Sequence, residues 1–334
     1  MSLLHLAYII ARRRIASSWR LELVLFLGIL LAVALLSSGV VFSDLLAETA
    51  LRRVLTQASK EEANMLVRVF NDLDDPNLTG RTPLYQNSVD FVDQKVTSRF
   101  EPYIKGHVRH LQTATFFFSG RPHLEFDIDL RPRGQFQYMT DLQDETRTKL
   151  EEGSWPSYDP DAEPADSNQP LEVALDRNGA ELLQLGVGDE LLVLPATGLQ
   201  EVETLPVKIV GIFSRLNPDD DIWYSREKDF SYQDQRWAWI PLFTAEAGIL
   251  EKVGETYPGI YTSVTWVYKL DRQGVRAGDV GSIQQAIRET RFQIAAHLEH
   301  GSSSIRLNRI LDDYSEQLLL ARIPLFLMVF LVTG

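Results

Sequence analysis

The feature of this sequence that most constrains its fold is an uncharged run of 20 residues from Leu23 to Phe42. As an α-helix this run rises about 30 Å, the thickness of the hydrocarbon core of a bilayer. Four arginines precede it, at positions 12–14 and 20, whereas Asp44 and Glu48 follow it. The positive-inside rule therefore predicts a membrane-spanning helix at 21–42, with a cytoplasmic N-terminus and an exported remainder.

A cleaved secretory signal is the alternative, because it would also start with basic residues followed by an apolar stretch. The run is, however, longer than the apolar region of about 7 to 15 residues typical of such signals. Within residues 1–20, Leu3, Leu6 and Ile10 fall at helical spacing. We therefore expect an amphipathic helix along the inner membrane surface before the span.

A second apolar run occupies 323–334, from Ile323 to Gly334, and its 12 residues are too few to cross a bilayer. It is either a short buried helix or strand, or the beginning of a second membrane helix. Arg322 and Pro324 at its start favour the second interpretation. We expect further spans beyond it, in which case this chain is part of a longer one.

Helical patterns lie next to both apolar runs. Residues 43–60 carry Leu51 and Leu55 on one apolar stripe, and residues 305–322 carry a second stripe. The residues that we single out on the second stripe are Leu307, Leu311 and Tyr314. We predict two stalk helices that pair antiparallel, the alternative being plain amphipathic helices packed on the domain.

The region between the stalks predicts an α+β fold with helices on one face of a sheet. Residues 61–156 read as strand, helix, strand and strand, the last at 123–130. A proline-rich acidic stretch at 157–170 is typical of a linker and opens a β-rich subdomain at 157–234. Residues 235–304 return to the first subdomain.

Strands are predicted within the second subdomain at Leu171–Asp176, Glu190–Leu194 and 205–213, with a helix after the first of them. A further helix is predicted near 278–300. The run Gly301–Ser304 is interpreted as a loop before the second stalk rather than as a nucleophile.

No known catalytic or cofactor motif is present in the sequence. The GxxxxGK[ST] and GxGxxG phosphate loops are absent, as is a GxSxG nucleophile elbow. The chain has no cysteine, and its two His-x-x-His pairs give too few ligands for a metal site. The net charge of −13 argues against nucleic acid as a partner. We expect a protein that is not an enzyme and holds no cofactor.

Short motifs occur in a fixed order between the two apolar runs. Glu152–Pro156 contains Trp155 and Pro156, Leu185–Asp189 contains Gly186, Gly188 and Asp189, and Val207–Ile212 contains Gly211. In this order they resemble the FtsX/MacB-like family of ABC transporter permeases, with Ser154 where the family usually has arginine. From the residues alone, Gly186 can end a helix in a left-handed conformation, and Gly188-Asp189 can form a tight turn.

The resemblance implies a permease subunit in the cell (inner) membrane, dimeric or pseudodimeric, whose stalks relay motion driven by a cytoplasmic ABC ATPase. ATP would be bound by that partner, and the exported domain would handle a lipoprotein, peptide or drug or would activate an envelope enzyme. Two alternatives remain. One is a membrane-tethered binding or sensor module without an ATPase, and the other is an exported hydrolase, for which the sequence shows no clustered polar set.

Overall fold

The structure of the chain is a computed structural model, in which the backbone is described for these residues: 3–59, 63–72, 81–120, 132–159, 169–196, 203–220, 223, 230–234, 236–298 and 301–333. The chain divides into two compact units. Unit 1 contains residues 1–58, 275–280 and 309–334, and unit 2 contains residues 59–274 and 281–308. The predicted strand at 123–130 lies outside the described residues.

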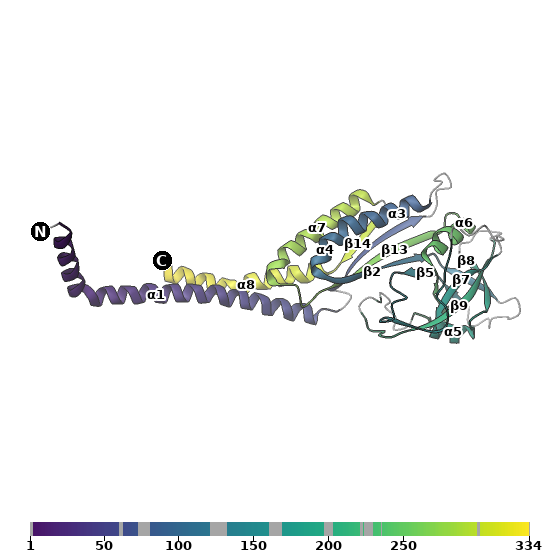
Figure 1. The fold of residues 1–334 in the computed structure, drawn as a ribbon, viewed down its shortest axis with the longest axis horizontal. Helices are drawn as coiled ribbons and strands as arrows, with labels where there is room; N and C mark the ends of the chain where they lie inside the picture. The colour runs from purple at the N-terminus through teal and green to yellow at the C-terminus, as the bar shows by residue number, and fades with distance from the viewer. Residues whose placement is uncertain are drawn as a thin grey trace. The chain divides into compact units, whose positions relative to one another are not determined.

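Unit 1 is built from two long helices that lie side by side and run antiparallel (Figure 1). These are α1 (Leu3–Gln57) and α8 (Leu307–Thr333). The hydroxyl group of Tyr314 on α8 donates a hydrogen bond of 3.1 Å to the carbonyl oxygen of Ala47 on α1. Ala47 and Leu51 are buried. The antiparallel pairing expected from the two apolar stripes is therefore seen in the structure.

A third segment, around the 3₁₀-helix η4 (Ala277–Asp279), completes unit 1. The carboxylate of Glu48 on α1 accepts a hydrogen bond of 3.0 Å from the backbone N–H of Ala277. The same carboxylate forms an ion pair of 2.9 Å with Arg52, one turn further along α1. Glu48 thus attaches η4 to the helix pair.

Within the part of the chain that the structure describes, no helix is long and apolar enough to cross a membrane.

Unit 2 is a mixed α+β domain whose described residues form one curled sheet of 14 strands. The sheet runs in the order β10-β11-β4-β3-β8-β9-β7-β12-β5-β2-β13-β1-β14, and β6 pairs with β9. The strands are β1 (Met65–Asp72), β2 (Ile104–Thr113), β3 (Phe116–Gly120), β4 (Pro132–Gly134), β5 (Phe136–Met139), β6 (Thr148–Gly153), β7 (Leu171–Asp176), β8 (Glu190–Pro195), β9 (Leu205–Arg215), β10 (Tyr232–Gln233), β11 (Ala238–Trp239), β12 (Leu242–Phe243), β13 (Tyr261–Leu270) and β14 (Gly301–Ile305). The hydrogen-bonded path passes without a break through both of the predicted subdomains.

Helices cover one face of the sheet around β1, β2, β13 and β14 (Figure 1). One of them is α7 (Val280–His297), and another segment runs through α3 (Arg81–Phe91), the π-helix η1 (Val92–Thr97), α4 (Ser98–Phe100) and the 3₁₀-helix η2 (Glu101–Tyr103). Trp266 of β13 donates a hydrogen bond of 3.1 Å to the Asp93 carboxylate, and the hydroxyl groups of Tyr268 and Thr97 lie 2.9 Å apart. The α+β fold with helices on one face of the sheet is confirmed.

The prediction of a loop at Gly301–Ser304 is wrong, because these residues belong to β14. β14 pairs antiparallel with β1, with Met65 opposite Ile305 and Val67 opposite Ser303. Serine and glycine have little intrinsic strand preference, so the local sequence suggests a loop. The strand forms because Ile305 is buried and β1 supplies the backbone partners.

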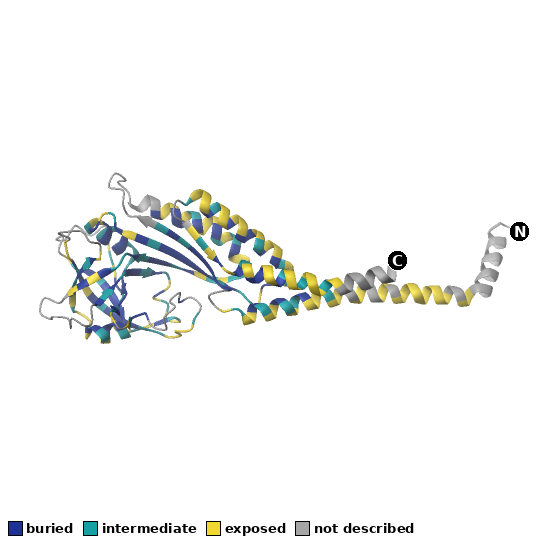
Figure 2. Cartoon of the chain, turned by 180° about the vertical axis from the view of Figure 1, so that it is seen from behind, coloured by how far each residue is buried: buried dark blue, intermediate teal, exposed yellow. Residues whose placement is uncertain are grey.

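The β-rich half of unit 2 contains the remaining short helices. α5 (Arg177–Leu183) follows β7, and a helical segment follows β12 as the π-helix η3 (Gly248–Val253) and α6 (Gly254–Thr256). β7 and β9 are parallel neighbours, whereas β8 and β6 pair antiparallel with β9. Figure 2 shows the buried residues concentrated along these strands. β9 is therefore the strand on which the segments carrying the predicted motifs meet.

Candidate functional site

Two glycines of the predicted motifs face each other where β6 meets β9. A Cβ atom on Gly211 would lie 2.2 Å from the carbonyl oxygen of Ser154, and one on Gly153 would lie 2.0 Å from that of Val210. The two backbones are close enough for the N–H of Ser154 to donate a 2.8 Å hydrogen bond to Val210. Only glycine permits this approach, which fixes the path of the chain into Trp155 and Pro156.

The Leu185–Asp189 segment also docks on β9. The backbone N–H of Gly188 donates a 2.7 Å hydrogen bond to the carbonyl oxygen of Ile209, and the N–H of Ile209 donates one of 2.9 Å to Asp189. Gly188 has φ +94°, a left-handed conformation that favours glycine. The expected tight turn at Gly188-Asp189 is therefore observed.

The expectation for Gly186 is wrong. The left-handed residue that ends α5 is Gln184, with φ 52°. Gly186 instead donates its backbone N–H to the carboxylate of Asp189 at 2.7 Å, which closes the turn locally. The sequence favours Gly186 for this conformation because glycine adopts it without strain, but the helix ends two residues earlier, at Gln184.

Trp155 and Pro156 line a cavity of about 670 Å³ in unit 2. The lining side chains come from the end of β5, the turn that follows it, the segment after β6, and the junction between β12 and the helical segment that contains η3. They are Tyr138, Met139, Asp141, Leu142, Gln143, Asp144, Trp155, Pro156, Phe243, Thr244, Ala245 and Glu246. The cavity thus has an apolar wall and three carboxylates.

The apolar wall rests on a cluster of aromatic residues. The Trp155 ring lies 5.3 Å from that of Phe213, and Phe213 lies 5.2 Å from Phe243 in an edge-to-face arrangement. Phe230 and Trp223 extend the cluster, with ring centroids 5.4 Å apart. Apart from Trp155, which is half-buried, these rings are buried. Such aromatic contacts stabilise the wall of the cavity.

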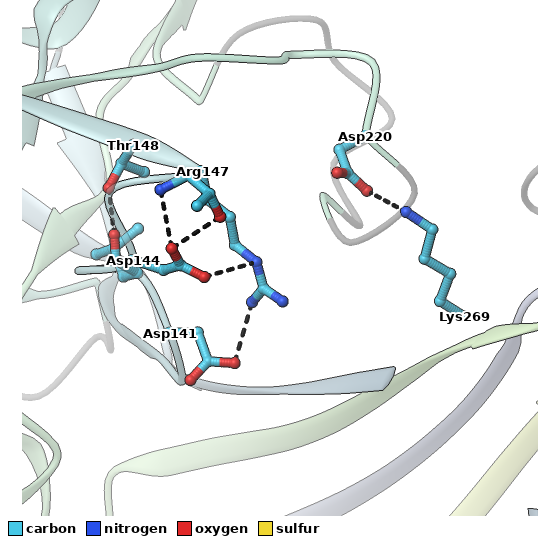
Figure 3. A network of polar contacts seen from close by, with 8 residues as sticks. Asp141, Asp144, Arg147, Thr148, Asp220 and Lys269 are labelled. Carbon is cyan, nitrogen blue, oxygen red and sulfur yellow. Dashed lines mark hydrogen bonds and ion pairs between the residues drawn. The ribbon is translucent and has the colours of Figure 1, made fainter. Parts of the chain in front are cut away.

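The carboxylates of Asp141 and Asp144 lie on the turn between β5 and β6, where both contact one guanidinium group (Figure 3). Arg147 approaches Asp141 at 3.1 Å and Asp144 at 3.6 Å. Asp144 also accepts hydrogen bonds of 2.8 Å from the backbone N–H and the hydroxyl group of Thr146. These two hydrogen bonds are the main reason that the pKa of Asp144 is lowered, so Asp144 is ionised at neutral pH.

The third carboxylate, Glu246, belongs to a partly buried network of hydrogen bonds. It accepts a 2.7 Å hydrogen bond from Arg109 of β2 and a short one from the hydroxyl group of Tyr85. Burial, together with the negative charge of Glu246, raises the pKa of Tyr138, which keeps its hydroxyl group protonated. Tyr138 therefore offers a neutral hydrogen-bonding group beside a charged carboxylate.

The other predicted site residues lie elsewhere. Leu51, Leu55, Leu311 and Tyr314 are buried in unit 1, and Leu307, also buried, belongs to unit 2. None of these residues lines the cavity. The cavity was not predicted from the sequence. The only indication of it in the sequence is the polar run that contains Asp141 and Asp144, upstream of Trp155.

Among the described residues, no group of three or more His, Asp or Glu side chains gathers in a way that could hold a metal ion. His107 is exposed and His110 is buried. The carboxylates of the cavity are bound to arginines and to hydroxyl or amide groups. Together with the apolar wall, they suit the binding of a ligand by charge and apolar contact.

Comparison with known proteins gives little support for any assignment. No protein-family model matches the sequence, and no curated protein matches it. One solved structure to which the chain is similar is a domain of a candidate permease protein from Porphyromonas gingivalis. The identity is 12%, the alignment covers 73% of this chain and 90% of that one, and the TM-score is 0.29. A similarity at this level carries no argument about the fold or function of the present chain.

Proposed function

We propose that this chain is the membrane-embedded subunit of an ABC transporter of the mechanical, FtsX/MacB-like type. The helix at Leu23–Phe42 anchors it in the cell membrane with the N-terminus in the cytoplasm, and the run from Ile323 begins a second membrane helix. Unit 2 is the exported domain. The subunit has no active site of its own, works as a homodimer or pseudodimer, and relies on a cytoplasmic ABC ATPase to bind and hydrolyse ATP.

The observation that carries this proposal is the packing of α1 against α8 within unit 1. Tyr314 is hydrogen-bonded to the backbone of α1, and the buried side chains Leu51 and Leu311 lie on the two apolar stripes. Two helices that leave the two apolar runs and pack together near Ala47 and Tyr314 could move as one body. Such a pair can relay a movement from the membrane to a domain, which a single flexible tether cannot do.

The ordered motifs give a second line of support. Trp155, Pro156, Gly188, Asp189 and Gly211 are the residues on which the resemblance to this permease family rests. Each of these glycines has a structural reason for its position, because the backbones approach closely at Gly211 and the chain is left-handed at Gly188. The three segments that carry the motifs all contact or contain β9, so the residues on which the resemblance rests lie together in the fold.

Copurification tests the proposal. The full-length protein, extracted from its native membrane in mild detergent, is expected to bring down the ABC ATPase encoded beside its gene and to change that ATPase's rate of ATP hydrolysis. Leu311→Glu places a charge in the packed face of α8, whereas Gln317→Glu places the same residue on its exposed face. We expect Leu311→Glu to abolish the effect on hydrolysis and Gln317→Glu to keep it. If neither variant alters the effect, the helix pair does not relay motion.

The cavity favours one alternative function, a membrane-tethered binding or sensor module that works without an ATPase. A lined cavity of about 670 Å³ is within the size range of small-molecule sites. If no ATPase copurifies while the domain still binds a ligand, this alternative replaces the permease.

A further inference from the structure

We propose that the cavity beside Trp155 is a binding site for a small amphiphilic amine, a ligand with one ammonium group on an aromatic or aliphatic body. The ammonium group lies against the carboxylates of Asp141 and Asp144, and the body lies against the apolar wall. The inference goes beyond the proposed function and does not depend on it, since the site is complete within unit 2.

The charge of the lining decides which sign of ligand the cavity prefers. Among the described side chains that line it, three are carboxylates and none is lysine or arginine. Glu246 is matched by Arg109, but Asp141 and Asp144 share Arg147 between them. Two negative charges against one positive charge leave an excess negative charge at this end, which favours a cation over an anion of the same shape.

The excess charge is held in a defined position. Asp141 is in a left-handed conformation, with φ 60°, and Asp144 is fixed by its two hydrogen bonds to Thr146. The side chain of Asp141 is 56% exposed, so one of its oxygens is accessible beside Arg147. A ligand ammonium group can therefore join this ion pair without separating it.

The apolar part of the lining suits an apolar body. Trp155 and Phe243 present aromatic surface, and Met139 and Leu142 add aliphatic surface. The face of a tryptophan ring also attracts a nearby ammonium group. This attraction favours the binding of a ligand whose charge is close to its apolar part. Tyr138, protonated at neutral pH, can accept a hydrogen bond from the ammonium group.

Three probes with one skeleton test the inference: 4-phenylbutylammonium, 4-phenylbutanol and 5-phenylpentanoate. Each is titrated by calorimetry into the full chain in neutral detergent micelles, with empty micelles as the blank. We expect the cation to bind about tenfold more tightly than the alcohol and the anion to bind more weakly still. Equal heats and affinities for all three probes would overturn the inference, as would the absence of binding by the cation.

Matched variants locate the effect. Asp141→Asn suits the left-handed conformation and removes one charge, so it is expected to weaken binding of the cation roughly fivefold. Glu145→Gln removes the same charge from an exposed neighbour that does not line the cavity, and it should leave the affinity unchanged. Ala245→Leu keeps every charge but adds bulk to the lining of the cavity, and it should weaken binding of all three probes. If Asp141→Asn and Glu145→Gln act alike, or if Ala245→Leu binds all three probes as tightly as the wild type does, the site is not this cavity. ATPase copurification is scored separately, so a failure here is distinguishable from a failure of the proposed function.

Discussion

At the scale of single residues, unit 2 depends on residues that are needed for its backbone geometry or its packing rather than for a chemical reaction. Gly153 and Gly211 are required because no Cβ fits between β6 and β9. Asp176, at the end of β7, is buried and accepts a short hydrogen bond from the hydroxyl group of Ser231. Both features make predictions about stability that can be measured on the full chain.

Gly211→Ala is expected to destabilise unit 2 by about 3 kcal/mol, because its methyl group would overlap the carbonyl oxygen of Ser154 and force β6 away from β9. Gly106→Ala is the matched control on β2, where a Cβ meets no atom within 4 Å. That control should change the free energy of unfolding by less than about 0.5 kcal/mol. Urea unfolding in neutral detergent measures both. Equal effects would mean that the β6–β9 approach is not tight.

The pH dependence of stability should reveal Asp176. Burial is the largest influence on its pKa and raises it, while the hydrogen bond from Ser231 opposes the rise. Folding therefore takes up a proton, and the stability linked to this group is full below the unfolded pKa and is lost as pH rises through the folded pKa. Asp176→Asn should be more stable than the wild type at pH 7, and the difference should shrink towards pH 4.

Asp144→Asn is the control, because its effect on stability is expected to change with pH in the opposite direction. Hydrogen bonds from Thr146 lower the pKa of Asp144, so the stability that it contributes is present above its unfolded pKa and is lost as pH falls through the folded pKa. This variant should be less stable than the wild type at pH 7 and equal to it at low pH. If the stability difference for Asp176→Asn does not change with pH, the buried carboxyl does not take up a proton on folding.

At the scale of elements, the packing of α1 on α8 is the contact that the proposed function needs. It combines buried side chains with the hydrogen bond from Tyr314 to Ala47. Burial raises the pKa of Tyr314, so its hydroxyl group remains a donor throughout the physiological range.

Tyr314→Phe is expected to loosen this helix pair by about 1 kcal/mol, the usual net contribution of one hydrogen bond. Hydrogen exchange of the α1 amides around Ala47 and Leu51 should become about fivefold faster. Ser315→Ala is the control, because the Ser315 hydroxyl bonds to Leu311 within α8 and makes no bond to α1. Equal exchange rates in the two variants would show that the Tyr314 hydrogen bond does not hold the helices together.

Elements with a strong periodic pattern could be predicted from the sequence, but the strands with which they pair could not. β1, β7, β9 and α7 are confirmed where alternation or helical spacing is clear. β14 was missed because its serines carry no pattern. The continuous sheet was missed because it depends on pairings between distant segments, such as the parallel pairs β4 with β11 and β5 with β12. The cavity could not be predicted for the same reason, since Asp141 and Glu246 lie far apart in the sequence.

At the scale of the whole molecule, we propose that two helices hold an acidic α+β domain outside the membrane. Residues 1–42 carry four arginines against Glu22, a net charge of +3, so the rest of the chain carries −16, and the total is −13. This asymmetry is the reason that we propose a cytoplasmic N-terminus and an exported unit 2. The orientation is the premise of both the transporter proposal and its sensor alternative.

Cysteine accessibility in intact cells tests that premise most directly, because the natural chain has no cysteine to interfere. Single cysteines are introduced as Glu145→Cys, at an exposed position of unit 2, and as Ser17→Cys, before the predicted span. A membrane-impermeant maleimide is added to spheroplasts before and after permeabilisation. If the N-terminus is cytoplasmic and unit 2 is exported, Glu145→Cys is labelled at once and Ser17→Cys only after permeabilisation. Labelling of Glu145→Cys only after permeabilisation would contradict this topology.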